Sequence, residues 1–523
     1  MIGRILTVGG FTLVSRITGF LRDIMLAAIL GAGPMADAFF VALRLPNHFR
    51  AIFAEGAFNA AFLPAYARIR SQSGGAVASL FADRIFTLLI AVETVLLALA
   101  LVFTPSVITL LAPGFSDDPG RFALAVELTR ITFPYLLLVS LATLYSGILN
   151  ALNRFAAAAA SPILLNVSMM VTMALAAYFP TAGHAAAWGV FIAGCLQVLQ
   201  VGYDTSRQGA LPRFHRFVLD DDVKKFFRAL GPATLGSAGT QIALFADTII
   251  ASFLAAGALS ALYYADRLNQ LPIGVIGIAV GTVLLPEMAS RIATGDDDGA
   301  RHAQNRAMEF TLLLSIPCFV AFLAVPDLIM RALFARGAFT TADAAAAAAT
   351  LAAYTIGLFP FVLLRSVSST FLARGNTATP VIALLISVGI NVGFKVLLMG
   401  RYAQVGLAIA TSIGVWVNFL LLVWFARRRN LIALDARFRR SLLKFAIAGL
   451  VLAAALVIGD QLFTVLFSQW SHFRALTTLA ALTGLGAIVY GGAVALLFGR
   501  EWLAAFRRRR DGRVAQSAGD EPT

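Results

Sequence analysis

Charged side chains that interrupt long apolar segments are the residues of this sequence most able to do chemistry. The basic ones are Arg16, Arg22, Arg44, Arg50, Arg267, Arg365 and Lys395, and the acidic ones include Asp23, Asp37, Glu55, Glu93, Asp247 and Asp266. A charge near the centre of a bilayer costs about 2.5–3.5 kcal/mol on insertion scales, so such groups are expected to face protein or a water-filled cavity. Guanidinium groups bind phosphate oxygens in planar, bidentate geometry.

Two interpretations of these buried charges remain open. The first is an anion-binding cavity formed by the four arginines Arg16, Arg22, Arg50 and Arg267. The second is internal ion pairing, for example of Arg22 with Asp23. Neighbouring residues point to different faces of a helix, which disfavours a pair of this kind. We therefore expect the cavity.

The composition indicates the elements that must position these groups. The chain has 523 residues, of which 59% are hydrophobic and 13% charged, with a net charge of +14. A soluble domain keeps about 25% of its residues charged. Each membrane crossing takes about 20 apolar residues as helix. The sequence therefore predicts an all-α polytopic membrane protein.

Apolar segments of spanning length predict 14 transmembrane helices. Their approximate cores are 6–31, 37–65, 85–111, 123–149, 158–180, 184–203, 229–255, 259–288, 307–331, 345–372, 379–400, 404–426, 443–462 and 475–498. Basic residues concentrate in the connections on one side, which the positive-inside rule assigns to the cytoplasm together with both termini. This distribution accounts for the basic charge, so no nucleic-acid partner is expected.

An internal repeat divides the chain into two lobes. The stretch Asp23–Gly33 is similar to Asp247–Gly257, and Pro134 and Pro162 have counterparts in Pro360 and Pro380. One copy contains six helices, so the two lobes enter the membrane in the same sense, as in many secondary transporters. The predicted domains are 1–205 (helices 1–6), 206–228 (cytoplasmic linker), 229–426 (helices 7–12), 427–500 (helices 13–14) and 501–523 (basic, disordered cytoplasmic tail).

The second apolar segment contains a proline, Pro46, that is expected to bend it. The bend is either a hinge of a gate or a static kink. The candidate gating or hinge residues are Pro46, Asn47, Glu55 and Asp266.

Several motifs resemble one known family. They are Asp37–Asn47, Arg50–Phe58, Ser15-Arg16, Gly19–Asp23 and Tyr263–Leu268. Together they resemble the MurJ (MviN) family of lipid II flippases, in the superfamily of multidrug, oligosaccharidyl-lipid and polysaccharide exporters, and the resemblance covers essentially the whole chain. It implies movement of undecaprenyl-diphosphate-linked disaccharide-pentapeptide from the cytoplasmic to the periplasmic leaflet of the bacterial inner membrane.

The resemblance also implies roles for individual residues. The substrate-binding residues would be Arg16, Arg22, Asp23, Asp37, Arg50 and Arg267. Helices 13 and 14 would form a hydrophobic groove for the lipid tail. Some members bind Na+ between helices 7 and 11; here Asp247 matches the acidic residue of that site, while Asn376 and Val388 match only part of the remainder.

We expect no cofactor, with Na+ or the membrane potential as the driving force. The expected partners are lipid II, membrane lipids and the cell-wall synthesis machinery, and we expect a monomer. The chain has no catalytic motif and no metal-ligand spacing among its five histidines. An enzyme acting on the lipid is therefore disfavoured. A flippase for another polyprenyl-diphosphate-linked glycan, or an ion-coupled exporter of the MATE type, remains an alternative.

Overall fold

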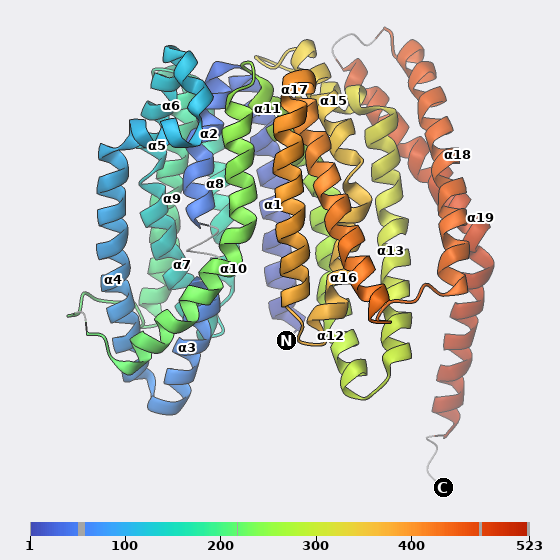
Figure 1. The fold of residues 1–523 in the computed structure, drawn as a ribbon, viewed down its shortest axis with the longest axis horizontal. Coiled ribbons are helices and arrows are strands. Elements are labelled where there is room, and N and C mark those ends of the chain that lie inside the picture. Colours follow the sequence, from blue (N-terminus) through green and yellow to red (C-terminus); the bar gives the residue numbers. More distant parts are fainter. Residues whose placement is uncertain (1, 51–57, 217, 470–472, 520–523) are drawn as a thin grey trace. The chain divides into compact units, whose positions relative to one another are not determined.

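The computed structural model describes residues 2–50, 58–216, 218–469 and 473–519, and these residues form helices and no strand (Figure 1). The first helices are α1 (Ile2–Leu30), α2 (Pro34–Phe49), α3 (Phe58–Ser73), α4 (Gly75–Val102), α5 (Thr104–Leu111), α6 (Pro119–Thr132), α7 (Tyr135–Ala151), α8 (Ala156–Ala174), α9 (Ala182–Arg207) and α10 (Asp221–Ser252). They are followed by α11 (Ala258–Pro272), the π-helical η4 (Ile273–Gly277), α12 (Ile278–Ala293), α13 (Asp297–Ala324), α14 (Pro326–Phe334), α15 (Thr341–Thr355), α16 (Leu358–Leu372), α17 (Ala378–Arg428), α18 (Ala436–Leu466) and α19 (Arg474–Gly519). Short 3-10 turns follow α5 (η2, Pro113–Asp117) and α8 (η3, Ala176–Tyr178).

The predicted apolar segments coincide with these helices or with pairs of them. Among the described residues, ten helical stretches are long and apolar enough to cross a membrane. One of the ten is α17, which covers two predicted segments and is broken at Ala403, where φ is 45°. The all-helical membrane class is thus confirmed, and the count of fourteen stays a prediction.

Aspartate and threonine side chains fix where several helices begin. Asp118, Thr181, Asp220, Asp296 and Asp435 each accept a hydrogen bond from a backbone N–H in the first turn of the next helix. Such caps satisfy donors that the helix itself leaves free. The acidic triplets near 220 and 296 therefore act as helix caps.

Asp220, Asp221 and Asp222 of the first triplet could each cap the helix that follows. In the structure the cap is Asp220, and Asp222 lies inside the first turn of α10.

The repeat appears in the helix boundaries. In each copy a long helix ends a few residues after the aspartate, at Leu30 in α1 and Ser252 in α10. The next helix begins directly after the final glycine of each copy, at Pro34 in α2 and Ala258 in α11. The two stretches therefore have similar local structure, as the repeat predicts, with the helix end of α10 two residues earlier in the repeat than that of α1.

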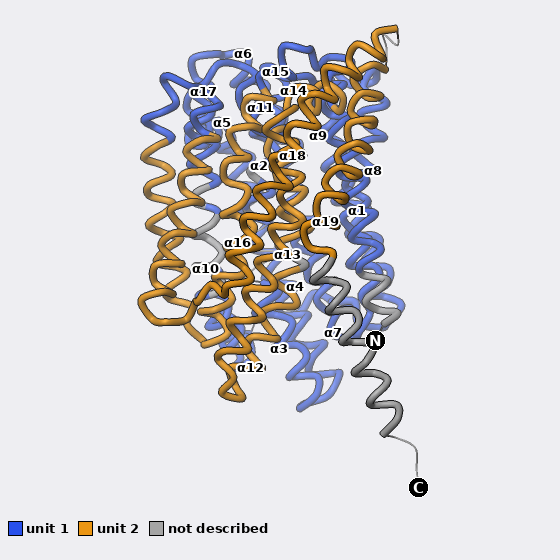
Figure 2. The backbone as a smooth tube through the Cα atoms, turned by 90° about the vertical axis from the view of Figure 1, so that its right-hand side faces the viewer, with its two compact units in different colours: residues 1–264, 334–346, 395–407 blue, residues 265–333, 347–394, 408–523 orange. Residues whose placement is uncertain are grey.

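The chain forms two compact units, drawn in different colours in Figure 2. The first unit contains residues 1–264, 334–346 and 395–407, and the second contains 265–333, 347–394 and 408–523. The first unit thus includes α10 and the start of α11, which the sequence assigned to the second lobe. The lobe boundaries themselves stay a prediction.

Small residues allow helices to approach closely within each unit. A Cβ atom added at Gly189 of α9 would lie 2.8 Å from Met169 Cα of α8, and would also meet Thr172 Oγ1. The Ser168 hydroxyl donates to the Gly189 carbonyl across the same contact, at 3.0 Å. Close backbone approach of this kind is typical of packing between membrane helices.

Replacing Gly189 with leucine should force α8 and α9 apart. We expect a loss of about 1–3 kcal/mol, the usual cost of overpacking, read as a lower thermal unfolding midpoint in detergent. Gly10→Leu is the matched control, because nothing lies within 4 Å of a Cβ atom at Gly10. Equal midpoints for the two variants would contradict the close contact.

Candidate functional site

Asp37 of α2 is the most completely enclosed carboxylate among the described residues of the first unit, with 0% of its surface exposed. It accepts hydrogen bonds from Arg121 Nη2 at 2.7 Å and from the Gly257 N–H at 2.8 Å. Ser260 donates its N–H at 2.8 Å and its hydroxyl at 2.5 Å. Four donors therefore surround one carboxylate, and they connect α2 with α6 and with the start of α11.

Arg121, at the start of α6, is itself held in place. Its guanidinium carbon lies 3.8 Å above the centre of the Phe115 ring, and Nη1 donates to the Leu254 carbonyl at 3.5 Å. Neither Arg121 nor Ser260 was expected from the sequence to be a functional residue. They lie 84 and 223 positions from Asp37, so no local pattern indicates that they meet.

A second polar cluster surrounds Arg22 and Asp23 of α1, which are 7% and 3% exposed. Arg22 Nη2 lies 2.7 Å from Asp23 Oδ1, and Arg22 Nη1 donates to Asn166 Oδ1 of α8 at 3.0 Å. The Tyr263 hydroxyl donates to Asp23 Oδ1 at 3.2 Å. The expectation that neighbouring residues would not pair is wrong here, because the long arginine side chain also reaches Asp23 through Nε, at 3.1 Å.

Asn166 completes this cluster and was missed in the sequence. Its amide nitrogen donates to the Ser15 carbonyl at 3.0 Å and to the Thr18 hydroxyl at 3.1 Å. Its carbonyl oxygen accepts from Arg22, so one asparagine joins two turns of α1 to α8. A single asparagine inside the apolar segment 158–180 was the available signal.

The remaining predicted residues of the first unit lie on α1 and α2. Arg16 is exposed on α1, and Arg50 is half-buried at the C-terminal end of α2, directly after Phe49. Pro46 and Asn47 are in the last turn of α2, where their carbonyls accept the Arg50 backbone N–H. Glu55 lies outside the described residues.

Arg267 and Asp266 belong to α11 in the second unit, where both are half-buried. Gln270, which lies one turn farther along the helix, donates its side-chain amide N–H to Asp266. The convergence of Arg267 with the arginines of the first unit stays a prediction.

Asp247, the residue expected to bind a monovalent cation, contacts an ammonium group. Lys395 Nζ of α17 donates to Asp247 Oδ1 of α10, and Lys395 is 2% exposed. Asn376 instead lies just before α17, where its side-chain oxygen Oδ1 accepts the Thr379 N–H at 3.1 Å. A lysine side chain therefore supplies positive charge at Asp247.

Two further contacts connect α2 with residues of α10 that lie close to Asp247 in the sequence. Arg44 Nη1 donates to the Thr248 hydroxyl at 3.0 Å, and His48 Nδ1 lies 2.8 Å from Gln241 Oε1. His48 is thus a hydrogen-bonded buried residue. Among the described residues, no group of three or more His, Cys, Asp or Glu side chains could hold a metal ion.

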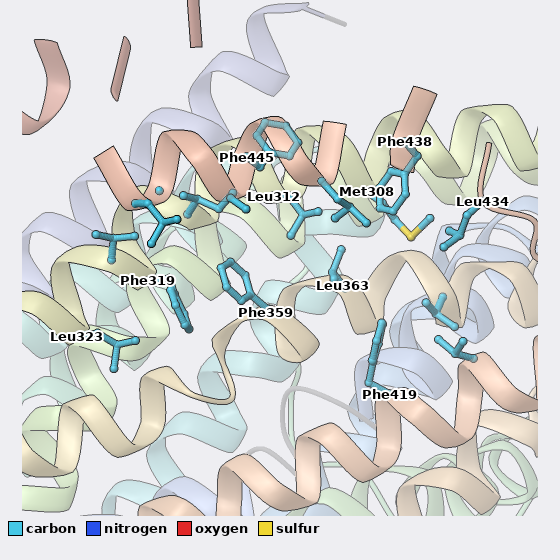
Figure 3. A pocket seen from close by; sticks show the side chains of 18 of the residues that line it. Met308, Leu312, Phe319, Leu323, Phe359, Leu363, Phe419, Leu434, Phe438 and Phe445 are labelled. Carbon is cyan, nitrogen blue, oxygen red and sulfur yellow. The ribbon is translucent and has the colours of Figure 1, made fainter. Parts of the chain in front are cut away.

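A long apolar groove lies within the second unit (Figure 3). It has a volume of about 990 Å³ and is lined by residues of α13, α16, α17 and α18 and of the connection between α17 and α18. Figure 3 shows Met308, Phe438 and Leu434 gathered at one end, with Phe319 and Leu323 at the other. The resemblance implied a groove formed by helices 13 and 14; α18 lines this one, and no lining residue comes from the described part of α19.

Ion pairs surround the α17–α18 connection. Arg306 of α13 contacts Glu309 Oε2 and Asp435 Oδ2, each at 2.5 Å. Burial raises the pKa of Asp435, but the Phe438 N–H and the Arg306 guanidinium outweigh it, so the pKa lies below its usual value. The ion pair of Arg306 with Asp435 thus holds this connection against α13.

Buried ion pairs on apolar helices, together with a groove large enough for a lipid chain, indicate the class of protein to which the chain belongs. The chain is a multi-pass membrane protein whose architecture is that of a transporter for a substrate with both polar and apolar parts.

Comparison with known proteins identifies the family. Residues 26–478 match the family described as "Lipid II flippase MurJ", and the chain belongs to this family. A protein of Rhizobium meliloti (strain 1021) described as "Probable lipid II flippase MurJ" is 40% identical over 97% of this chain and 96% of its own. A protein of the same description from Rickettsia prowazekii (strain Madrid E) is 34% identical over 94% and 95%.

Solved structures share the fold. A lipid II flippase MurJ in an inward closed conformation matches with a TM-score of 0.77 at 24% identity, over 95% of this chain and 99% of that one. An inward-facing MATE family transporter of the MOP superfamily matches with a TM-score of 0.68 at 16% identity, over 79% and 94%. Both likenesses concern the fold alone.

The Asp37–Arg121 pair can be tested by removing one partner at a time. Asp37→Asn leaves the Arg121 guanidinium buried without its counter-charge, so we expect a loss of about 3–5 kcal/mol, measured as a lower unfolding midpoint in detergent. Arg121→Met should be similarly harmful. The double variant should recover part of the loss, since no buried charge is left alone; additive losses would contradict the pairing.

Proposed function

We propose that this chain moves lipid II from the cytoplasmic to the periplasmic leaflet of a bacterial inner membrane by alternating access, with both termini in the cytoplasm. The observation that supports it most directly is the family match over residues 26–478. The diphosphate and sugar–peptide head of such a substrate cannot cross hydrocarbon unaided, whereas its tail can stay in lipid. A protein that shelters the head therefore lowers the barrier.

The proposed binding site for the diphosphate is the set of arginines Arg16, Arg22, Arg50 and Arg267. Arg22 supports this assignment because its guanidinium is buried on α1 and oriented by Asp23 and Asn166. A phosphate at Arg22 would compete with Asp23 for the same donors. Asp23 is therefore proposed to hold the empty site in shape.

Asp37 is proposed to act indirectly on the substrate. Its oxygens already accept four hydrogen bonds from Arg121, Gly257 and Ser260. We propose that it positions the beginnings of α2 and α11, while Pro46, Asn47, Glu55 and Asp266 serve as hinge or gate. The apolar groove of the second unit is proposed to take the lipid tail.

The variant Arg22→Ala tests this function in cells depleted of their own flippase. Wild type should restore lipid II at the outer leaflet, read with a membrane-impermeant label. Arg22→Ala should reduce the restored signal by about tenfold or more, the effect of losing one charge-assisted contact.

Arg439→Ala is the matched control, because Arg439 is exposed in the first turn of α18. Membrane-inserted wild type that restores no lipid II would overturn the proposed substrate and favour another polyprenyl-linked glycan. Equal signals from Arg22→Ala and Arg439→Ala would overturn the role of Arg22.

For the driving force we propose the membrane potential rather than bound Na+. The Lys395 ammonium at Asp247 supplies the positive charge that a bound Na+ would bring. A potential of 100 mV is worth about 2.3 kcal/mol per charge moved, and an inside-negative potential favours outward movement of an anion. We also propose that the protein acts as a monomer in contact with membrane lipids and with the cell-wall synthesis machinery.

Transport in sealed vesicles should therefore slow when an ionophore collapses the potential. Replacing Na+ with choline at constant potential should leave the rate unchanged. A rate that follows Na+ and ignores the potential would contradict this coupling.

A further inference from the structure

Glu93 is an acidic residue in α4, the most apolar of the ten candidate spans. It is the buried residue of the run 91–100, with 6% of its surface exposed. Leu89 and Leu97 lie four positions before and after it, so the three side chains share one face of the helix. A carboxyl group therefore occupies the core-facing side of a helix whose other faces are apolar and exposed.

Apolar clusters lie on both sides of Glu93 along the contact between α4 and α7. Toward the beginning of α4, Leu89 packs against a cluster that contains Leu144 of α7. Toward its end, Leu97 packs against a cluster that contains Leu136 of α7. The carboxyl group thus lies at mid-helix, between two apolar layers of the first unit.

The Ser140 hydroxyl of α7 donates to Glu93 Oε1 at 3.1 Å, and Ser140 is itself 3% exposed. Within the described ranges of the chain, no charged side chain acts on the Glu93 carboxyl, and Ser140 is its one side-chain partner. A neutral hydroxyl therefore provides what stabilisation the carboxyl receives.

The other acids in the interior of the first unit have a different environment. Asp37 and Asp23 each contact a guanidinium group, and Asp247 contacts an ammonium group. An ionised carboxylate in apolar surroundings without a counter-charge is costly, and such a group takes up a proton instead. The surroundings of Glu93 thus favour the neutral carboxylic acid.

We propose that Glu93 is a proton-binding site in the membrane interior, and that the bound proton keeps α4 packed against α7. The neutral acid fits between the apolar layers, and the Ser140 hydroxyl can both donate to it and accept from it. Loss of the proton leaves a negative charge between these layers, which favours separation of the helices and entry of water. The first unit is therefore sensitive to pH, whatever substrate the protein carries.

Infrared spectroscopy of the purified full-length chain reads the protonation state directly, because a neutral carboxyl and a carboxylate absorb at different frequencies. In a difference spectrum at neutral pH, wild type should show a carboxylic acid C=O band that Glu93→Gln lacks. Glu127→Gln is the matched control, because the Glu127 side chain is 61% exposed on α6; it should lose carboxylate bands only. Loss of carboxylate bands in Glu93→Gln would overturn the proton site.

The retained proton also fixes the sign of a pH effect on stability. Glutamate in the unfolded chain releases its proton near a pH of about 4.3, whereas the folded chain keeps the proton on Glu93 at neutral pH. The folded state then binds more protons than the unfolded state, so stability falls as the pH rises, by about tenfold in the folding equilibrium constant per pH unit.

Equilibrium unfolding in mixed micelles measures this effect. Glu93→Gln has no proton to lose at this position, so its stability relative to wild type should rise between about pH 6 and pH 8. The stability of Glu127→Gln relative to wild type should stay constant over the same range. A constant difference between Glu93→Gln and wild type would contradict the retained proton.

Hydrogen exchange of the folded chain tests the role of the proton in helix packing. Glu93→Gln is compared with wild type at each pH, which cancels the intrinsic effect of pH on amide exchange. Amides of α4 and α7 near Glu93 and Ser140 should exchange faster in wild type at alkaline pH and equally in both proteins at acidic pH. Equal exchange at alkaline pH would overturn the role in packing. No lipid II enters these measurements, so the proton site and the proposed function fail separately.

Discussion

Asp37 illustrates the constraint on which the charged interior of this protein depends. Hydrocarbon offers no water, so an enclosed carboxylate must receive its hydrogen bonds from the protein itself. Asp37 receives four, from Arg121, Gly257 and Ser260. Because these donors come from α6 and from the loop and first turn of α11, satisfying one charge fixes the relative positions of three segments of the first unit.

Three further acids of the first unit follow the same rule: Asp23 and Glu93 are buried, and Asp247 is half-buried. Asp23 is contacted by Arg22 and Tyr263, Asp247 by Lys395, and Glu93 by the Ser140 hydroxyl at 3.1 Å. Each pair joins helices that are distant in sequence or orients a neighbour on the same helix. The charges that first suggested a binding cavity therefore also hold the scaffold together, and in the proposed function a substrate anion competes with these internal contacts.

The groove of the second unit follows the opposite principle. Its lining is apolar except for Arg427, so it offers a lipid chain an environment like the bilayer itself. The family to which the chain belongs handles a lipid with a charged head. The first unit supplies enclosed charge and the second an apolar groove, and together these are the two environments that such a molecule needs.

The sequence predicted the helices well because hydrophobic length and the repeat are local properties. In each copy the helix that contains the aspartate ends within seven residues of it, and the next helix begins directly after the final glycine. Which buried side chains pair with one another could not be predicted in the same way. Arg121, Asn166 and Lys395 meet their partners across 84 or more positions, and helical periodicity does not specify which buried faces meet.

Local geometry also produced results that spacing did not predict. The Arg22–Asp23 pair forms between neighbours because arginine is long and flexible enough to turn back. The cap of α10 is Asp220 rather than Asp222, a difference of two residues that composition cannot resolve. The break within α17 at Ala403, by contrast, falls between the two predicted segments 379–400 and 404–426.

We propose that this chain alone moves lipid II across a bilayer. The most direct test reconstitutes the purified protein into sealed vesicles containing head-labelled lipid II and adds a membrane-impermeant quencher. In protein-free vesicles only the outer-leaflet label is quenched; with the protein we predict that the inner-leaflet label is quenched as well, while a head-labelled phospholipid in the same vesicles is not moved. Folded protein that leaves the inner-leaflet lipid II unquenched would contradict the account.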